Sequence, residues 1–208
     1  MNKNFNLIDL LNLKFLNSNE LLFNNIKILK FNQSFFFNNL INDTFYIHYS
    51  NNKINFYYNL FYLCNNNITD INNKKINNFI NLLILNISNN KQFFKNLKKG
   101  CKKNVLINFI ENKEENEYIL QYISDFFNIN IIVLDCEINK IHCYYNNNEF
   151  DKYKNIFIFT KLNNKHYLLF KKNKYIFEIK DIPWFSKNMD LCQRCNLNCK
   201  IDNFITNF

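Results

Sequence analysis

The chain has 208 residues, 48% of them hydrophobic and 18% aromatic, which suffices for the core of one ordinary domain plus extensions and excludes extensive disorder. A single glycine excludes the glycine-rich phosphate loops of P-loop and dinucleotide-binding proteins, and the zinc-protease motif His-Glu-x-x-His is absent. The formal net charge of +9 comes almost entirely from lysines spread along the chain. Nucleic-acid binders usually gather charge on one face and favour arginine, so this diffuse charge favours a solvated surface.

Nothing in the sequence predicts export or membrane insertion. The first residues, Met1–Asn6, are polar, and no apolar segment with a small-residue cleavage site follows them. No run approaches the ~20 apolar residues that a bilayer span needs. Seven cysteines without a secretory signal indicate a reducing compartment, in which thiols or metal ligands are expected rather than disulfides.

We expect three parts along the chain. Residues 1–45 are predicted to be an N-terminal extension that packs on the core, residues 46–180 to be the core, and residues 181–208 to be a Cys-rich appendix. Within the extension, Phe5–Phe15 is predicted to be a short helix, while Glu20–Phe31 is helix or strand, a choice that its pattern leaves open.

Helices are expected in the first half of the core. Asn55–Cys64 is almost continuously apolar and aromatic, and we interpret it as a buried helix. Ile76–Ile87 repeats apolar residues at the spacing of one helix face, and so does Glu114–Phe127, whose early glutamates suit a helix N-terminus. Between these two helices, Gly100 is expected to supply a turn with positive φ.

Strands are expected after residue 128, where the hydrophobic period changes to two. Ile129–Asp135 is β-branched and predicts a central strand, with Lys140–Tyr145 as its hairpin partner. Further antiparallel strands are predicted at Asn155–Lys161, Lys165–Phe170 and Lys174–Ile179. Helices followed by a meander sheet define an α+β fold.

One pattern in this order points to chemistry. The aromatic helical segment precedes the strand Ile129–Asp135, and a late strand carries His166 followed by Tyr167 in the sequence NKHYLLF of Asn164–Phe170. Over residues 54–170 this layout resembles the OTU-like and papain-like cysteine proteases. It is especially similar to proteins of large DNA viruses that carry a Thr-x-Phe-Trp-Cys-Phe helix before such a strand. The Asn- and Lys-rich composition, nearly devoid of residues with GC-rich codons, also indicates an AT-rich genome such as that of a large DNA virus.

The resemblance implies a thiol nucleophile on the helix and His166 as its base, since a nearby histidine lowers the pKa of a thiol. Laying Asn55–Leu60 on the viral motif places Asn59 where the cysteine stands, and an amide cannot replace a thiolate. Cys64 is five residues further on, about 500° and about 7.5 Å along a helix. It would therefore form a different site, and Cys64 with His166 is the catalytic pair to consider.

A metal site is predicted in the appendix. Cys192, Cys195 and Cys199 form a C-x2-C-x3-C run, which has the ligand spacing of structural zinc. Disulfide formation and unligated thiols are the alternatives for these residues. The fourth zinc ligand would come from elsewhere in the chain, with candidates Cys101, Cys136, Cys143, His142 and His48, and with Asp190 and Asp202 as further options.

Other polar residues are interpreted as structural. Neighbours on a strand point to opposite faces, so His142 and Cys143 on the predicted hairpin cannot both face one site. Four glutamates near a helix start are expected to be solvated and matched to the helix dipole rather than to act in acid/base catalysis. These glutamates are Glu111, Glu114, Glu115 and Glu117.

The function these features favour is non-catalytic. We expect a viral structural or protein-interaction protein on a degenerate cysteine-protease-like fold, located in the virion or in a virus factory in the host cytoplasm. Its expected partner is a protein, either a viral structural protein or a ubiquitin-like protein. An active OTU-like protease or deubiquitinase using Cys64 and His166 is the first alternative. A basic nucleic-acid-associated protein with a zinc knuckle is the second.

Overall fold

The computed structural model describes residues 27–30, 45–49, 55–63, 72–89, 101–138, 140–145, 150–171 and 174–185. Helices and one six-stranded sheet make up this part, which confirms the α+β class. The helices are α3 (Asn55–Leu63), α4 (Asn73–Asn89), α6 (Lys103–Glu111) and α7 (Glu117–Phe127). The strands are β1 (Lys27–Lys30), β2 (Tyr46–Tyr49), β3 (Asn130–Asp135), β4 (Lys140–Tyr144), β5 (Ile156–Leu162) and β6 (Lys165–Phe170). No helix in these ranges is long and apolar enough to cross a membrane.

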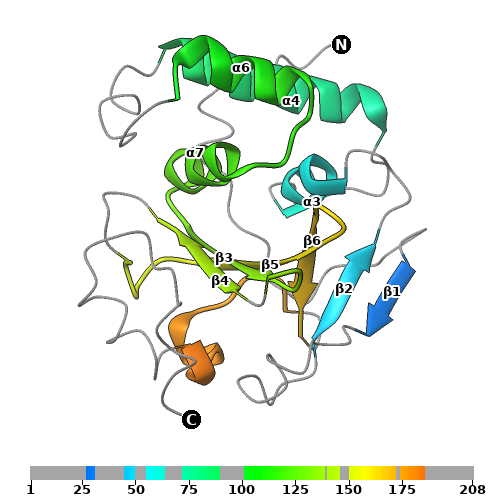
Figure 1. Cartoon of the computed structure of the whole chain (residues 1–208), viewed down its shortest axis with the longest axis vertical. Helices are drawn as coiled ribbons and strands as arrows, with labels where there is room; N and C mark the ends of the chain where they lie inside the picture. Colours follow the sequence, from blue (N-terminus) through cyan, green and yellow to red (C-terminus); the bar gives the residue numbers. More distant parts are fainter. Residues whose placement is uncertain are drawn as a thin grey trace, which may run out of the picture.

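The elements stack in layers (Figure 1). Helices α4 and α6 lie side by side on the outside, α3 and α7 lie between them and the sheet, and the segment ending at Phe185 lies beyond the other face of the sheet. Alternate residues of the strands enter two apolar clusters. Ile131 and Val133 join the cluster under the helices, whereas Ile132 and Leu134 join the cluster on the opposite face. β3 is buried along its whole length, because both of its faces are covered.

The predicted meander is wrong in its connectivity. The strand order is β1-β2-β6-β5-β3-β4, and β3 pairs with β5 in parallel, with Ile131 opposite Phe157. The two predicted hairpins, β3–β4 and β5–β6, are present, and positive φ at Asn163 and Asn164 closes the second one. Since β4 occupies one side of β3, the buried β3 satisfies its other edge with β5, and the chain must cross over to reach it.

The strand predicted at Lys174–Ile179 is also wrong. Two isolated bridges, Ile156 with Phe177 and Lys171 with Lys174, take its place, and a 3₁₀ helix follows at Ile179–Asp181. The alternation of apolar residues nevertheless has a cause: Tyr175 packs on the helix side of the sheet and Phe177 on the opposite side. Glu178 and Asp181 form a reciprocal capping box that turns the chain before a ladder can continue.

The helix predictions that fall within the described ranges are confirmed with shifted ends. α3 is buried, as expected for Asn55–Cys64, and α4 buries the predicted apolar face from Ile76 to Ile87. α7 begins at Glu117 rather than at residue 114, because the Asn116 side chain accepts a hydrogen bond from the backbone N–H of Ile119 and caps the helix there. Asn128 ends α7 in the left-handed conformation.

Several predictions concern residues outside the described ranges. The helix at Phe5–Phe15 and the turn at Gly100 lie there, and so does most of Glu20–Phe31. The end of that last segment is β1, which pairs with β2 at the edge of the sheet. The division into an extension, a core and an appendix stays a prediction.

One carboxyl group on α7 predicts a pH-dependent stability. Burial raises the pKa of Asp125 to about 6, although a hydrogen bond from Gln121 and the charge of Lys154 act in the opposite direction. A raised pKa in the folded state means that the group stabilises the fold when protonated, below about pH 4, and that this contribution is lost as the pH rises through about 6. The ionised form also opposes the dipole at the end of the helix.

We therefore expect Asp125→Asn to stabilise the protein at pH 7.5 by about 1 kcal/mol, after discounting for solvent screening of this half-buried group. That corresponds to a rise in Tm of roughly 2–4 °C. The gain should vanish near pH 4. Thermal unfolding followed by circular dichroism at both pH values checks this, and an equal gain at both would contradict it.

Candidate functional site

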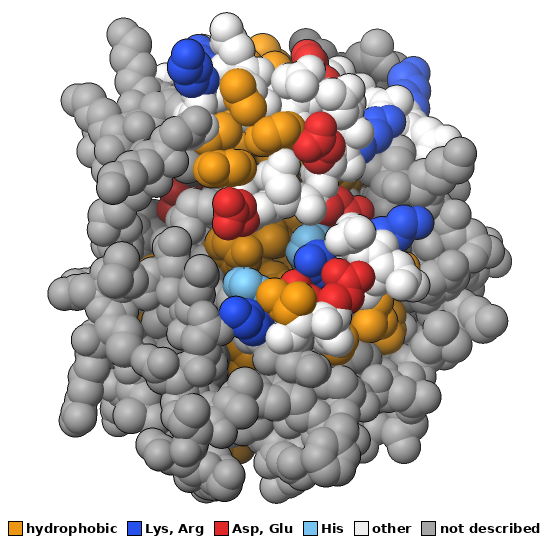
Figure 2. Space-filling view, in the orientation of Figure 1, with side chains coloured by type: hydrophobic (Ala, Val, Ile, Leu, Met, Phe, Trp, Pro, Cys, Tyr) orange, Lys and Arg blue, Asp and Glu red, His pale blue; other side chains and the backbone are white. Residues whose placement is uncertain are grey.

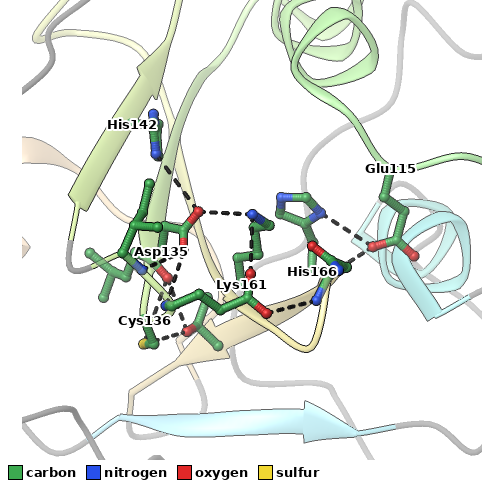
Figure 3. Close-up of polar contacts among 11 residues, drawn as sticks. Glu115, Asp135, Cys136, His142, Lys161 and His166 are labelled. Carbon is green, nitrogen blue, oxygen red and sulfur yellow. Dashed lines mark hydrogen bonds and ion pairs between the residues drawn. The ribbon is translucent and has the colours of Figure 1, made fainter.

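The candidate site lies at the end of the sheet where β3 and β5 finish and β6 begins. Cross-strand pairing puts Asp135 beside Lys161, and Lys161 beside His166. His166 shares its strand face with Leu168 and Phe170, which pack under the helices, so it also faces the helical layer. Figure 3 shows these side chains together, with Glu115 approaching from the helical side.

His166 is bound twice by one carboxylate. Its backbone N–H donates to Glu115 Oε2 at 2.6 Å, and its ring Nδ1 lies 3.2 Å from the same oxygen. The side chain of His166 is only 4% exposed, and that of Glu115 is 10% exposed. The ring of Phe56, in the first turn of α3, lies against the imidazole with centroids 5.8 Å apart. α3 and the histidine strand are thus brought together as the resemblance implies.

The loop between α6 and α7 presents Glu115. The Tyr57 hydroxyl donates to the backbone carbonyl of Glu114 at 3.0 Å, which ties this loop to α3. Burial, followed by the charges of Glu115 and Glu114, holds the pKa of Tyr57 well above its usual range, so the hydroxyl stays a donor. Lys113 turns the loop with a φ of 58°.

The prediction that Glu115 is solvated is therefore wrong. Four glutamates stand between residues 111 and 117, and nothing in their spacing marks the one that turns inward. The contact spans 51 residues of sequence. A polar loop between two amphipathic helices is the sole signal that could have suggested it.

Asn59 is fully buried, at 0% exposure. On α3 it shares a face with Phe56, Leu60 and Leu63, which are also fully buried. Residues three apart on a helix are neighbours, so Asn59 lies one turn from the residue that touches His166. Asn59, the residue that the sequence resemblance aligns with a cysteine, therefore faces inward beside β6 and carries an amide.

Cys64 lies outside the described residues, so its predicted role stays a prediction. α3 ends at Leu63, seven residues beyond Phe56 and about 10 Å further along the helix axis. The end of the helix that leads to Cys64 is thus the end remote from the Phe56–His166 contact.

Three thiols lie within the described part of the chain, and none forms a disulfide there. Cys136 Sγ lies 3.3 Å from Thr160 Oγ1 at the end of β3. Cys143 packs in the cluster on the far face of the sheet, and Cys101 packs against the cluster under the helices. Cys136 and Cys143 thus both contribute to packing.

The zinc prediction for Cys192, Cys195 and Cys199 also lies outside the described residues and stays a prediction. Within the described ranges, no group of three or more His, Cys, Asp or Glu side chains could hold a metal ion. The expectation that His142 and Cys143 face opposite ways is confirmed. His142 Nε2 lies 3.9 Å from Asp135, whereas Cys143 joins the cluster on the far face of the sheet.

A second polar cluster, which the sequence did not predict, adjoins His166. Asp135 Oδ2 accepts a hydrogen bond from Lys161 Nζ at 3.0 Å, and Oδ1 accepts from the backbone N–H groups of Glu137 and Ile138. Burial alone would lower the pKa of Lys161, but its hydrogen bonds to Asp135 and Glu137 raise it, so the ammonium stays charged. Burial lowers the pKa of His142 despite the charge of Asp135, so His142 is neutral at neutral pH.

The surface around these residues is recessed. In Figure 2, histidine side chains are visible in a hollow between the helical layer and the end of the sheet, with hydrophobic side chains at its floor and acidic and basic side chains at its rim. A histidine held by a carboxylate can accept a proton from a nucleophile that lies beside it. The class that fold and site define together is an α+β protein with a buried histidine–carboxylate pair.

Comparisons with known proteins add one likeness. No protein-family model matches the sequence, and no curated protein matches it. Among solved structures, the chain is similar to an ovarian tumor (OTU) domain in complex with ubiquitin, with a TM-score of 0.47 and 16% identity. The match covers 68% of this chain and 81% of that chain.

Proposed function

We propose that this protein is a non-catalytic protein-interaction module built on a degenerate OTU/papain-like arrangement. The observation that carries the proposal is Asn59. It is fully buried on the face of α3 whose first turn contacts His166, and it occupies the position where the resemblance requires a thiol. An amide has no ionisable proton and cannot form the covalent intermediate of such enzymes.

A protein partner is the expected ligand, and a ubiquitin-like protein is the form that the resemblance implies. Large apolar side chains exposed on the helical layer, Leu85 at 55% and Val105 at 40%, provide contact area for a protein surface. A viral structural protein is the other partner considered. A location in the virion or in a virus factory belongs to the proposal because it follows from the similarity to large-DNA-virus proteins.

A ubiquitin electrophile probe tests the proposal. We expect the reduced wild-type protein to form no adduct, while unmodified ubiquitin added to ¹⁵N-labelled protein shifts backbone amide signals on α4 and α6 around Leu85 and Val105. Cys64→Ala should behave identically in both measurements. An adduct on the wild type that disappears in Cys64→Ala would contradict the proposal that the protein is non-catalytic. Absence of any amide shift would remove ubiquitin as the partner.

The second candidate is an active cysteine protease. The Glu115–His166 pair favours it, because a carboxylate-bound imidazole is the base that a thiol nucleophile needs. This candidate requires Cys64, which follows the end of α3 remote from the Phe56–His166 contact, to reach the imidazole. His166 would take the thiol proton, Cys64 would attack the acyl carbon, and the imidazolium would return the proton to the leaving group. Cleavage of a ubiquitin-derived substrate that requires both Cys64 and His166 is the result that would establish it.

A further inference from the structure

The contact with Glu115 determines which ring nitrogen of His166 carries the hydrogen. A carboxylate oxygen only accepts hydrogen bonds, so the 3.2 Å contact between Glu115 Oε2 and His166 Nδ1 requires a hydrogen on Nδ1. In a neutral imidazole the other nitrogen, Nε2, then carries the lone pair. The same oxygen also accepts the backbone N–H of His166 at 2.6 Å, which aligns the carboxylate with the start of β6.

The carboxylate is held from its own side as well. Tyr57 ties the preceding residue, Glu114, to α3, and the Asn116 side chain caps α7 immediately after Glu115. Two elements thus fix the loop on either side of this one side chain. A carboxylate in such a position has a defined orientation toward its partner rather than a choice of rotamers.

No other residue on this face of β6 can orient the His166 ring. The next position on the same strand face is Leu168, which is apolar and fully buried. A group that orients the ring therefore has to come from another element. Among the described residues, the charged or titratable groups near His166 include Glu115 and Glu114 from the α6–α7 loop, Tyr57 from α3, and Lys161 from β5, whose charge is paired with Asp135.

We propose that Glu115 is the positioning residue of His166, and that the site keeps the base and the orienting carboxylate of a thiol-hydrolase triad. Glu115 holds the ring as the Nδ1–H tautomer and stabilises the imidazolium that forms when Nε2 accepts a proton. Asn59 stands at the nucleophile position. This inference rests on the proposed function, because it assigns a role within the same site.

Nitrogen NMR of the imidazole rings in the full-length chain tests it. The chain has three histidines, so the loss of signals in His166→Gln assigns this ring. The wild type, observed in its neutral form, should show a protonated Nδ1 and an unprotonated Nε2. Glu115→Met, which removes the acceptor at similar volume, should exchange the two nitrogen signals wholly or in part. Glu115→Gln keeps an acceptor and should preserve the tautomer.

Glu111→Gln is the matched control, since it removes an exposed carboxylate from the end of α6 and should change nothing. A wild-type ring in the Nε2–H form would overturn the proposal, as would an unchanged tautomer in Glu115→Met. If Glu115→Met fails to fold, the tautomer of His166 in the wild-type spectrum still tests the proposal. A ubiquitin-probe adduct on the wild type would refute the non-catalytic function without affecting this result, so the two failures are distinguishable.

Discussion

Asn59→Cys should create a reactive thiol at residue 59. The new Sγ would stand one helical turn from Phe56, whose ring lies against His166. Its proton would pass to His166 Nε2, and the resulting thiolate–imidazolium pair would be stabilised by Glu115. An ordinary thiol has a pKa near 8.5, whereas a thiol beside such a base titrates about two or more units lower.

The expected result, at pH 6.5, is an alkylation rate at residue 59 roughly tenfold above that of an equally buried thiol that lacks the base, as in Asn59→Cys combined with His166→Gln, because the thiolate fraction rises more than the nucleophilicity falls. Iodoacetamide labelling with mass spectrometry of the peptide that contains residue 59 measures it. The seven native cysteines serve as internal references.

Two double variants identify the cause of the reactivity. Asn59→Cys with His166→Gln should have the pH profile of an ordinary thiol. Asn59→Cys with Glu115→Gln should shift the midpoint of the pH profile toward that of an ordinary thiol, because the imidazolium loses its counter-charge. If all three proteins have the same pH profile, position 59 is not coupled to His166 and the assignment of the nucleophile position fails.

The sequence predicted one half of this site and missed the other for a physical reason. His166 and the apolar run at Asn55–Cys64 were identifiable because each belongs to a local pattern, a strand of period two and a continuous apolar helix. Glu115 became a site residue through packing alone, since two helices and a strand must meet before its side chain leaves solvent. Local periodicity contains no information on that encounter.

Because local periodicity contains no information on tertiary contacts, it also failed to predict part of the strand pairing in the sheet. The strands from residue 130 to residue 170 were predictable from β-branched residues and a period of two, and the β5–β6 hairpin from its short turn. The parallel pairing of β3 with β5 was not, because it depends on which edge of β3 is still unpaired after the β3–β4 hairpin forms. At Lys174–Ile179 the alternation was real, but capping by Glu178 and Asp181 ended the pairing. Apolar residues with a period of two therefore predict burial on two faces of a sheet more reliably than they predict continuous backbone pairing with a neighbouring strand.

The Asp135 carboxylate lies where these unpredicted features meet, and removing it should have the largest effect on stability. The residue is 3% exposed and joins the end of β3 to the following turn through the N–H groups of Glu137 and Ile138, and to β5 through Lys161. Asp135→Ala leaves two turn donors and a charged ammonium without this acceptor. An unsatisfied buried group costs about 1–3 kcal/mol, and these partly exposed donors fall at the low end of that range because water can reach them, so we expect a fall in the free energy of unfolding of about 2 kcal/mol.

Urea unfolding followed through Trp184, the single tryptophan and a buried one, measures this change. Glu137→Gln is the matched control. Its side chain contacts the same Lys161 at 3.3 Å but is 33% exposed, and a partly solvated ion pair contributes less than about 1 kcal/mol. If the two variants lose equal stability, the burial of Asp135 is not what makes it important. A large loss confined to Asp135→Ala would mean that the cluster beside His166 maintains the crossover between β3 and β5, and with it the strand end from which His166 meets Glu115.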